Sequence, residues 1–186
     1  MIDQSSCRTD MLRARVWSYH DRPLKLPVNH RNFGLTVYGA ISTHHEPLFG
    51  IYDNTTIVNG LDFLEKMSSW ADVDEPYLVV LDRHPSHTSR RLAEAFPKRW
   101  TLKYMPPASS MLNAIEWVWG VLKQRVRDLL CSEPKELERE AFRTMLEDSC
   151  KYICRSEGFG ARMLLANRSY LQHCLRGLLD ERRGLD

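Results

Sequence analysis

Residues 77–81 read Tyr-Leu-Val-Val-Leu and run directly into an acidic residue, Asp82. A continuous apolar run of this length is typical of a strand that is covered on both faces, as strands of parallel sheets are. A short helix over about 89–96 and another strand over 100–104 are predicted to follow, and this order implies a right-handed parallel crossover. We therefore expect an α/β fold with Asp82 beyond the carboxyl end of a buried strand, where open α/β sheets bind ligands.

The residues before this run predict further strands. Residues 35–41 and 47–52 are rich in β-forming side chains and are separated by a short polar segment, which predicts an antiparallel hairpin. Residues 16–28 are expected to add one or two edge strands. Between the hairpin and the apolar run, apolar residues at helical spacing predict a helix with Asn59 as its N-cap.

The residues after the run predict three helices. A long helix is expected over 112–130, because apolar residues recur there at spacings of three and four. Its predicted core stripe consists of Leu112, Ile115, Trp119, Leu122, Val126 and Leu129. Two more helices are expected over about 135–154 and 161–179, with Pro134 in the first turn of the former.

The overall composition favours a soluble protein with one sizeable core. Hydrophobic residues make up 43% of the 186 residues and charged residues 27%. No apolar run approaches the length of a membrane span, and the first residues do not resemble a secretory signal. We therefore expect an intracellular protein with no membrane contact. The formal net charge of +2 is too small to indicate a nucleic-acid partner by itself.

The five cysteines are odd in number, which favours reduced thiols. Cys150 and Cys154 would share one helix face, and together with His173 and Cys174 they could form a zinc site. Small thiols packed within helices explain the same spacing without a metal, and the chain has no pair of cysteines two residues apart. Packing is therefore the preferred interpretation.

Asp82 and Glu116 are the acidic residues whose predicted positions suggest chemistry. Glu116 lies early in the long helix, between Ile115 and Trp119 of the core stripe, so we expect it to flank the buried seam and not to point into open water. Taken singly, Asp82 is also explained as a turn residue and Glu116 as an acid at a helix start. Clustered carboxylates repel each other unless a cation neutralises them, and their hard oxygens favour Mg²⁺ or Mn²⁺. Such a site suits phosphoryl transfer.

Two segments around these acids resemble known motifs. Residues 78–87, Leu-Val-Val-Leu-Asp-Arg-His-Pro-Ser-His, resemble the second-aspartate motif of mariner-related DDE transposases. Residues 104–123 resemble that family's segment of two prolines followed by Asn-x-Ile-Glu and an aromatic helix. Thirty-three residues separate Asp82 from Glu116, which is close to the family's spacing. The similarity covers about residues 1–130, and the Asn-x-Ile-Glu segment is its most specific part.

The resemblance implies an α/β domain with the RNase H-like fold: a mixed five-stranded sheet flanked by helices, with extra C-terminal helices. Residues 1–130 would form the catalytic domain, and residues 131–186 a helical extension packed on it. The family's three catalytic and metal-binding carboxylates would correspond to Asp3, Asp82 and Glu116. Asp3 is assigned through the short match of Ile2-Asp3-Gln4 to the first-strand pattern.

Five further residues are expected near this site. His87 matches the family's histidine and would line the site or orient Asp82, although a hydrogen-bonded histidine at a helix start explains it equally well. Asn113 would line the site as well. Arg83 replaces the usual asparagine, and its guanidinium would compete with a metal ion unless it points toward DNA phosphate. Lys123 and Arg127 are candidate phosphate contacts, although ordinary solvated side chains would produce the same pattern.

The implied activity is cleavage of DNA phosphodiesters at transposon ends, followed by joining of the 3′-hydroxyl to target DNA, with two Mg²⁺ or Mn²⁺ ions. The implied partners are double-stranded DNA, both transposon ends and target, and a second copy of the chain in a homodimer. The expected location is the nucleus in a eukaryote, or the cytoplasm and nucleoid in a bacterium. Two alternatives stay open: a transposase-derived DNA-binding protein with impaired catalysis, and another RNase H-like nuclease.

Overall fold

The computed structural model describes residues 1–11, 32–72, 74–107, 109–132 and 137–183. Within these residues the chain forms one five-stranded sheet with the order β3-β2-β1-β4-β5. The strands are β1 (Ile2–Arg8), β2 (Gly34–Ala40), β3 (Leu48–Tyr52), β4 (Leu78–Leu81) and β5 (Thr101–Tyr104). The predicted edge strands at 16–28 lie outside the described residues.

The sheet is mixed, as predicted. β1 pairs antiparallel with β2, and β2 pairs antiparallel with β3, which confirms the predicted hairpin. β4 pairs parallel with β5 over four residues, which confirms the parallel crossover. β1 and β4 also run parallel, but they pair only at Ile2 and Leu81. The first strand of the chain is therefore the central one, and a single residue pair joins it to the parallel half of the sheet.

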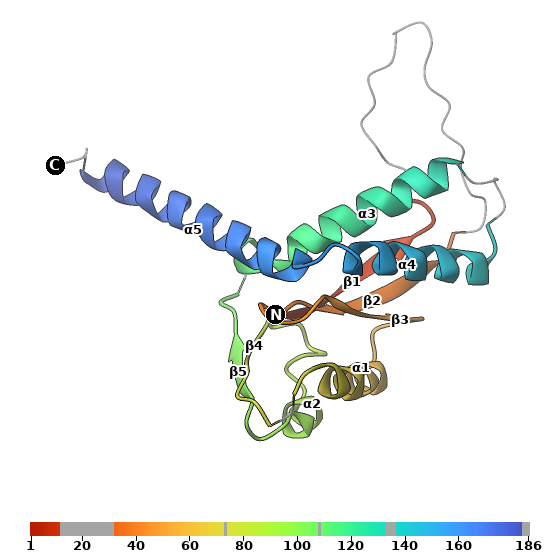
Figure 1. Cartoon of the computed structure of the whole chain (residues 1–186), viewed down its shortest axis with the longest axis horizontal. Coiled ribbons are helices and arrows are strands. Elements are labelled where there is room, and N and C mark those ends of the chain that lie inside the picture. Colours follow the sequence, from red (N-terminus) through yellow and green to blue (C-terminus); the bar gives the residue numbers. More distant parts are fainter. Residues whose placement is uncertain (12–31, 73, 108, 133–136, 184–186) are drawn as a thin grey trace, which may run out of the picture.

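Helices cover both faces of the sheet (Figure 1). α1 (Ile57–Trp70) and α2 (Arg90–Ala95) lie on one face, and α3 (Ile115–Ser132) and α4 (Arg139–Cys154) lie on the other. α5 (Phe159–Arg183) begins near α4 and extends away from the sheet. Each face has its own core, one around Tyr38 and Phe63 and the other around Trp119 and Phe142. No helix in the described residues is both long and apolar enough to cross a membrane.

The start of α1 differs from the sequence prediction. Thr56, and not Asn59, is the N-cap, because the Thr56 hydroxyl accepts a hydrogen bond from the backbone N–H of Asn59. Asn59 is already inside the helix, and its side-chain amide donates to the backbone carbonyl of Asn54. Both residue types cap helices well, and they are three positions apart, so the sequence pattern did not distinguish them.

The long helix begins later than predicted, because residues Ser110–Leu112 form a 3₁₀ turn before it. Ile115, Trp119, Leu122 and Val126 are all buried, as the core stripe predicted. Leu112 and Leu129 are only half-buried, and Leu130 is buried instead. The stripe therefore ends one residue further along than the spacing suggested.

The strand at 77–81 is less covered than predicted. Val79 and Leu81 are buried, but the side chain of Leu78 is 63% exposed. Side chains alternate between the two faces of a strand, so Val79 and Leu81 share the face that packs in the core with Phe63, whereas Leu78 is on the opposite face, and β1 pairs with β4 only at Leu81. A continuous apolar run indicates that a strand is in the sheet interior, but not how far its neighbour extends.

The last two helices lie close to their predicted positions. α4 begins at Arg139, and the predicted first turn at Pro134 lies outside the described residues. Cys150 is buried in the core, and the Cys154 thiol contacts the backbone carbonyl of Pro47, which supports packing over zinc binding for these two residues. The side chains of His173 and Cys174 lie outside the described part of the chain.

Candidate metal centre

Asp82 follows β4 directly, at the carboxyl end of the strand, as predicted. Its Oδ1 atom accepts a hydrogen bond from the backbone N–H of His84 at 3.0 Å, which closes a tight turn. The same oxygen lies 2.5 Å from Nδ1 of His87, a side chain that is only 2% exposed. The turn 82–87 therefore holds Asp82 in one orientation and brings His87 back onto it.

Asp3 lies on the central strand β1 and is 6% exposed. Its Oδ1 accepts the backbone N–H of Gln4 at 2.8 Å. Its Oδ2 accepts two side-chain donors of the α3 region, Nδ2 of Asn113 at 2.9 Å and Nε1 of Trp119 at 3.2 Å. A buried carboxylate requires such donors, because burial without hydrogen bonds is costly. The structure thus places Asn113, which was predicted to line the site, in contact with the Asp3 carboxylate.

Asp3 and Asp82 meet because of strand register. Ile2 pairs with Leu81, and the residue after each is an aspartate. One ligand atom from each of Asp3, Asp82 and His87 lies within 4.8 Å of the other two. Within the described residues, these three side chains form a group that is close enough together to hold a metal ion. The two predicted aspartates are therefore together in the structure.

The electrostatics of this group favour a bound cation. Burial raises the pKa of Asp3 to about 6, and the charges of Asp82 and Glu116 add to the increase, while its hydrogen bonds from Gln4 and Trp119 oppose it. Burial also lowers the pKa of His87 and outweighs the opposing effect of Asp82, so the imidazole does not supply a compensating positive charge near neutral pH. A divalent ion would stabilise the ionised carboxylates.

Glu116 lies at the edge of this group. It is in the first turn of α3, and its backbone N–H donates to the carbonyl of Asn113. Its charge raises the pKa of Asp3, so the two carboxylates interact. Its side chain is exposed, however, and it is outside the set of ligand atoms within 4.8 Å. The expectation that Glu116 avoids open water was wrong, because at this end of α3 the core stripe is formed by Ala114, Ile115 and Val118.

In the described parts of the chain, the hydrogen-bond partners of Arg83 and Arg127, and the electrostatic partner of Lys123, are groups other than the three carboxylates. Nε of Arg83 donates to the carbonyl of Met105, just beyond β5, and within the described residues no ion pair joins Arg83 to Asp82. The hydrogen bond holds the Arg83 side chain to the segment after β5 and not to Asp82. Lys123 is half-buried and acts electrostatically on Cys7 of β1, while Arg127 donates to Gln124 on its own helix. Their role as phosphate contacts stays a prediction.

Trp119 was predicted only as a packing residue, and it does pack in the core beside Phe49. Its Nε1 also donates to Asp3, a contact that the spacing of the core stripe did not predict. A buried indole usually needs a partner for its N–H group, and this requirement was the available signal. Gly120, by contrast, has no atom of the described residues within 4 Å of the position of a Cβ atom, so this side of α3 faces open space there.

The comparisons with known proteins agree with this geometry. A family model described as "DDE superfamily endonuclease" matches residues 1–139, which include the two aspartates and Glu116. The chain belongs to the DDE superfamily endonuclease family. DDE enzymes use divalent metal ions, as the observed carboxylate group would suggest. Among curated proteins, none matches the chain significantly.

A solved structure supports the predicted fold of this DDE domain. The chain resembles a chain of the simian T-cell lymphotropic virus intasome in complex with the PP2A regulatory subunit B56 gamma, with a TM-score of 0.50 and 14% sequence identity. The match covers 63% of this chain and 43% of that one, so the DDE chain described here spans less than half of its structural relative. At this identity the likeness concerns the fold, and it confirms the RNase H-like architecture.

Proposed function

We propose that this DDE domain cleaves DNA phosphodiesters and transfers the resulting 3′-hydroxyl end to a second DNA. The observation that carries the proposal is the meeting of Asp3 and Asp82 at the β1–β4 pair, with His87 behind Asp82. Membership of the family supports the class of reaction, and the cluster of Asp3, Asp82 and His87 supports the position of the active site. The transposon ends, the target DNA and a homodimeric assembly are part of this proposal.

We assign the metal ligands to Asp3, Asp82 and Glu116. The donor set fits a hard divalent ion such as Mg²⁺ or Mn²⁺, because carboxylate oxygens dominate it. In addition, Oδ1 of Asn113 is buried and accepts no hydrogen bond from the described residues, so a polar partner at this site would satisfy it. When bound, a pair of ions supplies activation of the attacking hydroxyl and neutralisation of the leaving oxygen. The exposed Glu116 is the ligand we expect to move most on binding.

The protein's own residues hold this site in shape. Asn113 and Trp119 fix one oxygen of Asp3, and the backbone of Gln4 fixes the other. His87 fixes Asp82 through a bond of 2.5 Å. With neutral His87 and with Arg83 bound to Met105, no described cation occupies the place of the metal. We assign Lys123 and Arg127 to phosphate contacts along α3, with low ionic strength favouring them.

The decisive experiment is a strand-transfer assay with a DNA duplex that carries a pre-formed 3′-hydroxyl end, in Mg²⁺ and in Mn²⁺. We expect joined products from the unchanged protein and a loss of at least about 100-fold for Asp82→Asn and Glu116→Gln. Glu140→Gln is the matched control, because Glu140 is an exposed acid in the first turn of α4. This control should retain activity.

Each other outcome has a distinct meaning. Hydrolysis without joined products would assign the chain to another class of RNase H-like nuclease. DNA binding without either product, in both metals, would overturn the catalytic proposal in favour of a DNA-binding role. If Glu116→Gln behaved like Glu140→Gln while Asp82→Asn was inactive, Glu116 would lose its assignment as a ligand.

A further inference from the structure

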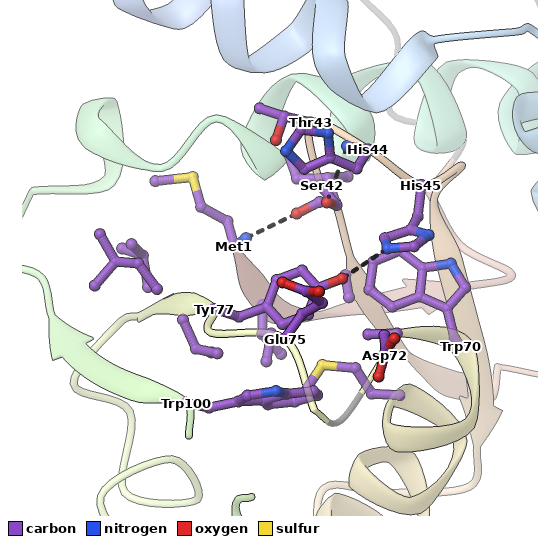
Figure 2. Close-up of a pocket in the computed structure, with 18 of the residues that line it drawn as sticks. Met1, Ser42, Thr43, His44, His45, Trp70, Asp72, Glu75, Tyr77 and Trp100 are labelled. Carbon is purple, nitrogen blue, oxygen red and sulfur yellow. Dashed lines mark hydrogen bonds between the residues drawn. The ribbon is translucent and has the colours of Figure 1, made fainter. Parts of the chain in front are cut away.

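The aromatic side chains of this domain lie in different surroundings. Trp70, Tyr77 and Trp100 line a cavity of about 750 Å³ beside the start of β4 (Figure 2), and none of the three carboxylates is among the residues that line it. Trp117 lies instead on the surface of α3, directly after Glu116, and its side chain is 49% exposed. This exposed indole is therefore the aromatic group that adjoins the metal centre along the chain.

Trp117 is fixed in place by α5, which passes beside the start of α3 (Figure 1). Its indole N–H group donates to Oδ1 of Asn167 at 3.3 Å, and Nδ2 of Asn167 donates to the backbone carbonyl of Leu112 at 3.2 Å. Asn167 is only 3% exposed, so this buried amide connects α5 to the chain on both sides of Glu116. The ring of Tyr170, one turn further along α5, meets the indole at 74°, with 6.3 Å between the ring centroids. The indole is thus held in one defined orientation.

One face of the held indole stays open. A ring that meets it nearly at a right angle covers at most one of its two faces, and about half of the side chain is exposed. Gly120, one turn further along the same side of α3, has no atom of the described residues within 4 Å of a Cβ position. A flat group can therefore lie against Trp117 without displacing a described side chain.

The charges around this surface suit a ligand that carries phosphate. Among the described side chains of α5, from 159 to 172, the charged ones are Arg162 and Arg168, and none is acidic. Arg168 is exposed and lies between Asn167 and Tyr170 in the sequence. Glu116 is the acidic neighbour on α3, and a metal ion bound there would neutralise it.

We propose that Trp117 and Tyr170 form a stacking platform for an unpaired base of the DNA, beside the reactive 3′ end that the carboxylates bind. This role rests on the proposed function, which brings DNA to Glu116. Adjacent Cα atoms are about 3.8 Å apart, so a phosphate held at Glu116 places its own nucleotide or the next one within reach of the indole. Bases inside a duplex are stacked on their neighbours, so an unpaired base is the one with a face to offer. Stacking on aromatic rings tolerates any base, so the platform recognises an opened strand end and not a particular sequence.

The test compares the binding of two labelled DNA duplexes by fluorescence anisotropy in Mn²⁺. Both duplexes carry the same short unpaired extension at one 3′ end, but in the second duplex the extension lacks its bases. Neither DNA has a 3′-hydroxyl, so joining does not consume it. We expect the unchanged protein to prefer the extension with bases by roughly 5- to 150-fold, the range for stacking of one base. Trp117→Ala should remove most of this preference, and Tyr170→Ala should reduce it.

Two further variants separate stacking from packing. Trp117→Phe keeps an aromatic face but loses the hydrogen bond to Asn167, so it should retain most of the preference. Tyr152→Ala is the matched control, because Tyr152 is an exposed aromatic residue of α4 whose ring already has the guanidinium of Arg125 over it, 3.9 Å from the centroid. This variant should keep the full preference.

Three results would overturn the platform. Equal binding of both duplexes by the unchanged protein is the first, and equally tight binding of a blunt duplex is the second. The third is an equal loss for both duplexes in Trp117→Ala, which would leave Trp117 with a packing role between α3 and α5. A preference for bases without joined products in the strand-transfer assay would contradict the proposed function alone, whereas joined products without that preference would contradict the platform alone.

Discussion

The carboxylate of Asp3 accepts three hydrogen bonds, but its burial and its acidic neighbours disfavour its ionised form. Gln4, Asn113 and Trp119 all donate to it. Burial and two acidic neighbours nevertheless raise its pKa to about 6, from an ordinary value of 3.8. A carboxyl group in this condition keeps its proton up to a higher pH than an ordinary aspartate does, and a bound cation would favour its charged form.

The stability of the metal-free protein should therefore fall as the pH rises from about 4 to about 7. In this range the folded state keeps a proton on Asp3 that the unfolded state has already released, so the folded state binds more protons and loses stability with increasing pH. The shift corresponds to about 3 kcal/mol at most. Urea unfolding at a series of pH values measures it. Asp3→Asn should flatten this dependence, and a slope that persisted in the variant would have to come from other groups.

His87 is expected to control metal affinity through Asp82. His87→Gln removes the ring that fixes Oδ1 of Asp82, and loss of a group that orients a ligand typically costs 10- to 100-fold in metal affinity. A Mn²⁺ titration followed by calorimetry measures the change. His84→Gln is the matched control. The exposed His84 side chain contacts Ser86, and the substitution leaves the hydrogen bond from the backbone N–H of residue 84 to Asp82 in place. Equal affinities for the two variants would contradict the orienting role.

At the level of elements, β2 and α3 approach each other closely at Gly39. A Cβ atom at this position would lie 2.5 Å from Cη2 of Trp119 and 3.2 Å from Cδ1 of Ile115. The absence of a side chain at Gly39 therefore allows the indole to approach the backbone of β2, the strand that neighbours β1. In that position its N–H group reaches Asp3. A packing contact between two elements thus sets the geometry of one carboxylate.

Gly39→Ala should destabilise the protein by about 1–3 kcal/mol, as overpacked core substitutions do, and should also weaken Mn²⁺ binding by displacing Trp119 from Asp3. Gly120→Ala is the matched control, because this exposed helical glycine has open space around it. That variant should gain up to about 1 kcal/mol. Thermal unfolding with and without Mn²⁺ measures both effects. If Gly39→Ala lost stability but kept full affinity, Trp119 would have a packing role only.

The elements themselves could largely be predicted from the sequence, because strand and helix identities depend on local periodicity. The hairpin, the crossover and the stripe of α3 were all found in this way. The exposure of Leu78 and the choice of Thr56 as the cap were not, because they depend on how far β1 extends and on one specific hydrogen bond. In the site, the position of Asp82 was predictable at the strand end. Asp3 was identified only through resemblance, and its bond to Trp119 depends on a side-chain direction that spacing does not give.

At the level of the whole molecule, α4 belongs to the core that supports the site. Phe142 and Leu146 of this helix are fully buried in the same cluster as Trp119 and Ile115. Phe142 also packs edge to face against Phe33, which precedes β2. Residues 131–186 were predicted as a helical extension packed on the catalytic domain. In the structure, α4 supplies buried side chains to the same core as residues 1–130.

A chain that ends at residue 130 should therefore lose its cooperative unfolding transition and its Mn²⁺ binding, because removing α4 uncovers the face of α3 that carries Val118 and Leu122. Phe142→Ala gives a graded version of the same test and should cost about 3–5 kcal/mol, the range for a large aromatic removed from a core. Leu165→Ala is its control, since Leu165 is 59% exposed, and should change stability by less than about 0.5 kcal/mol. Calorimetric unfolding distinguishes these cases. A 1–130 chain that unfolded in one sharp transition and bound Mn²⁺ normally would instead make the first 130 residues a self-sufficient catalytic domain.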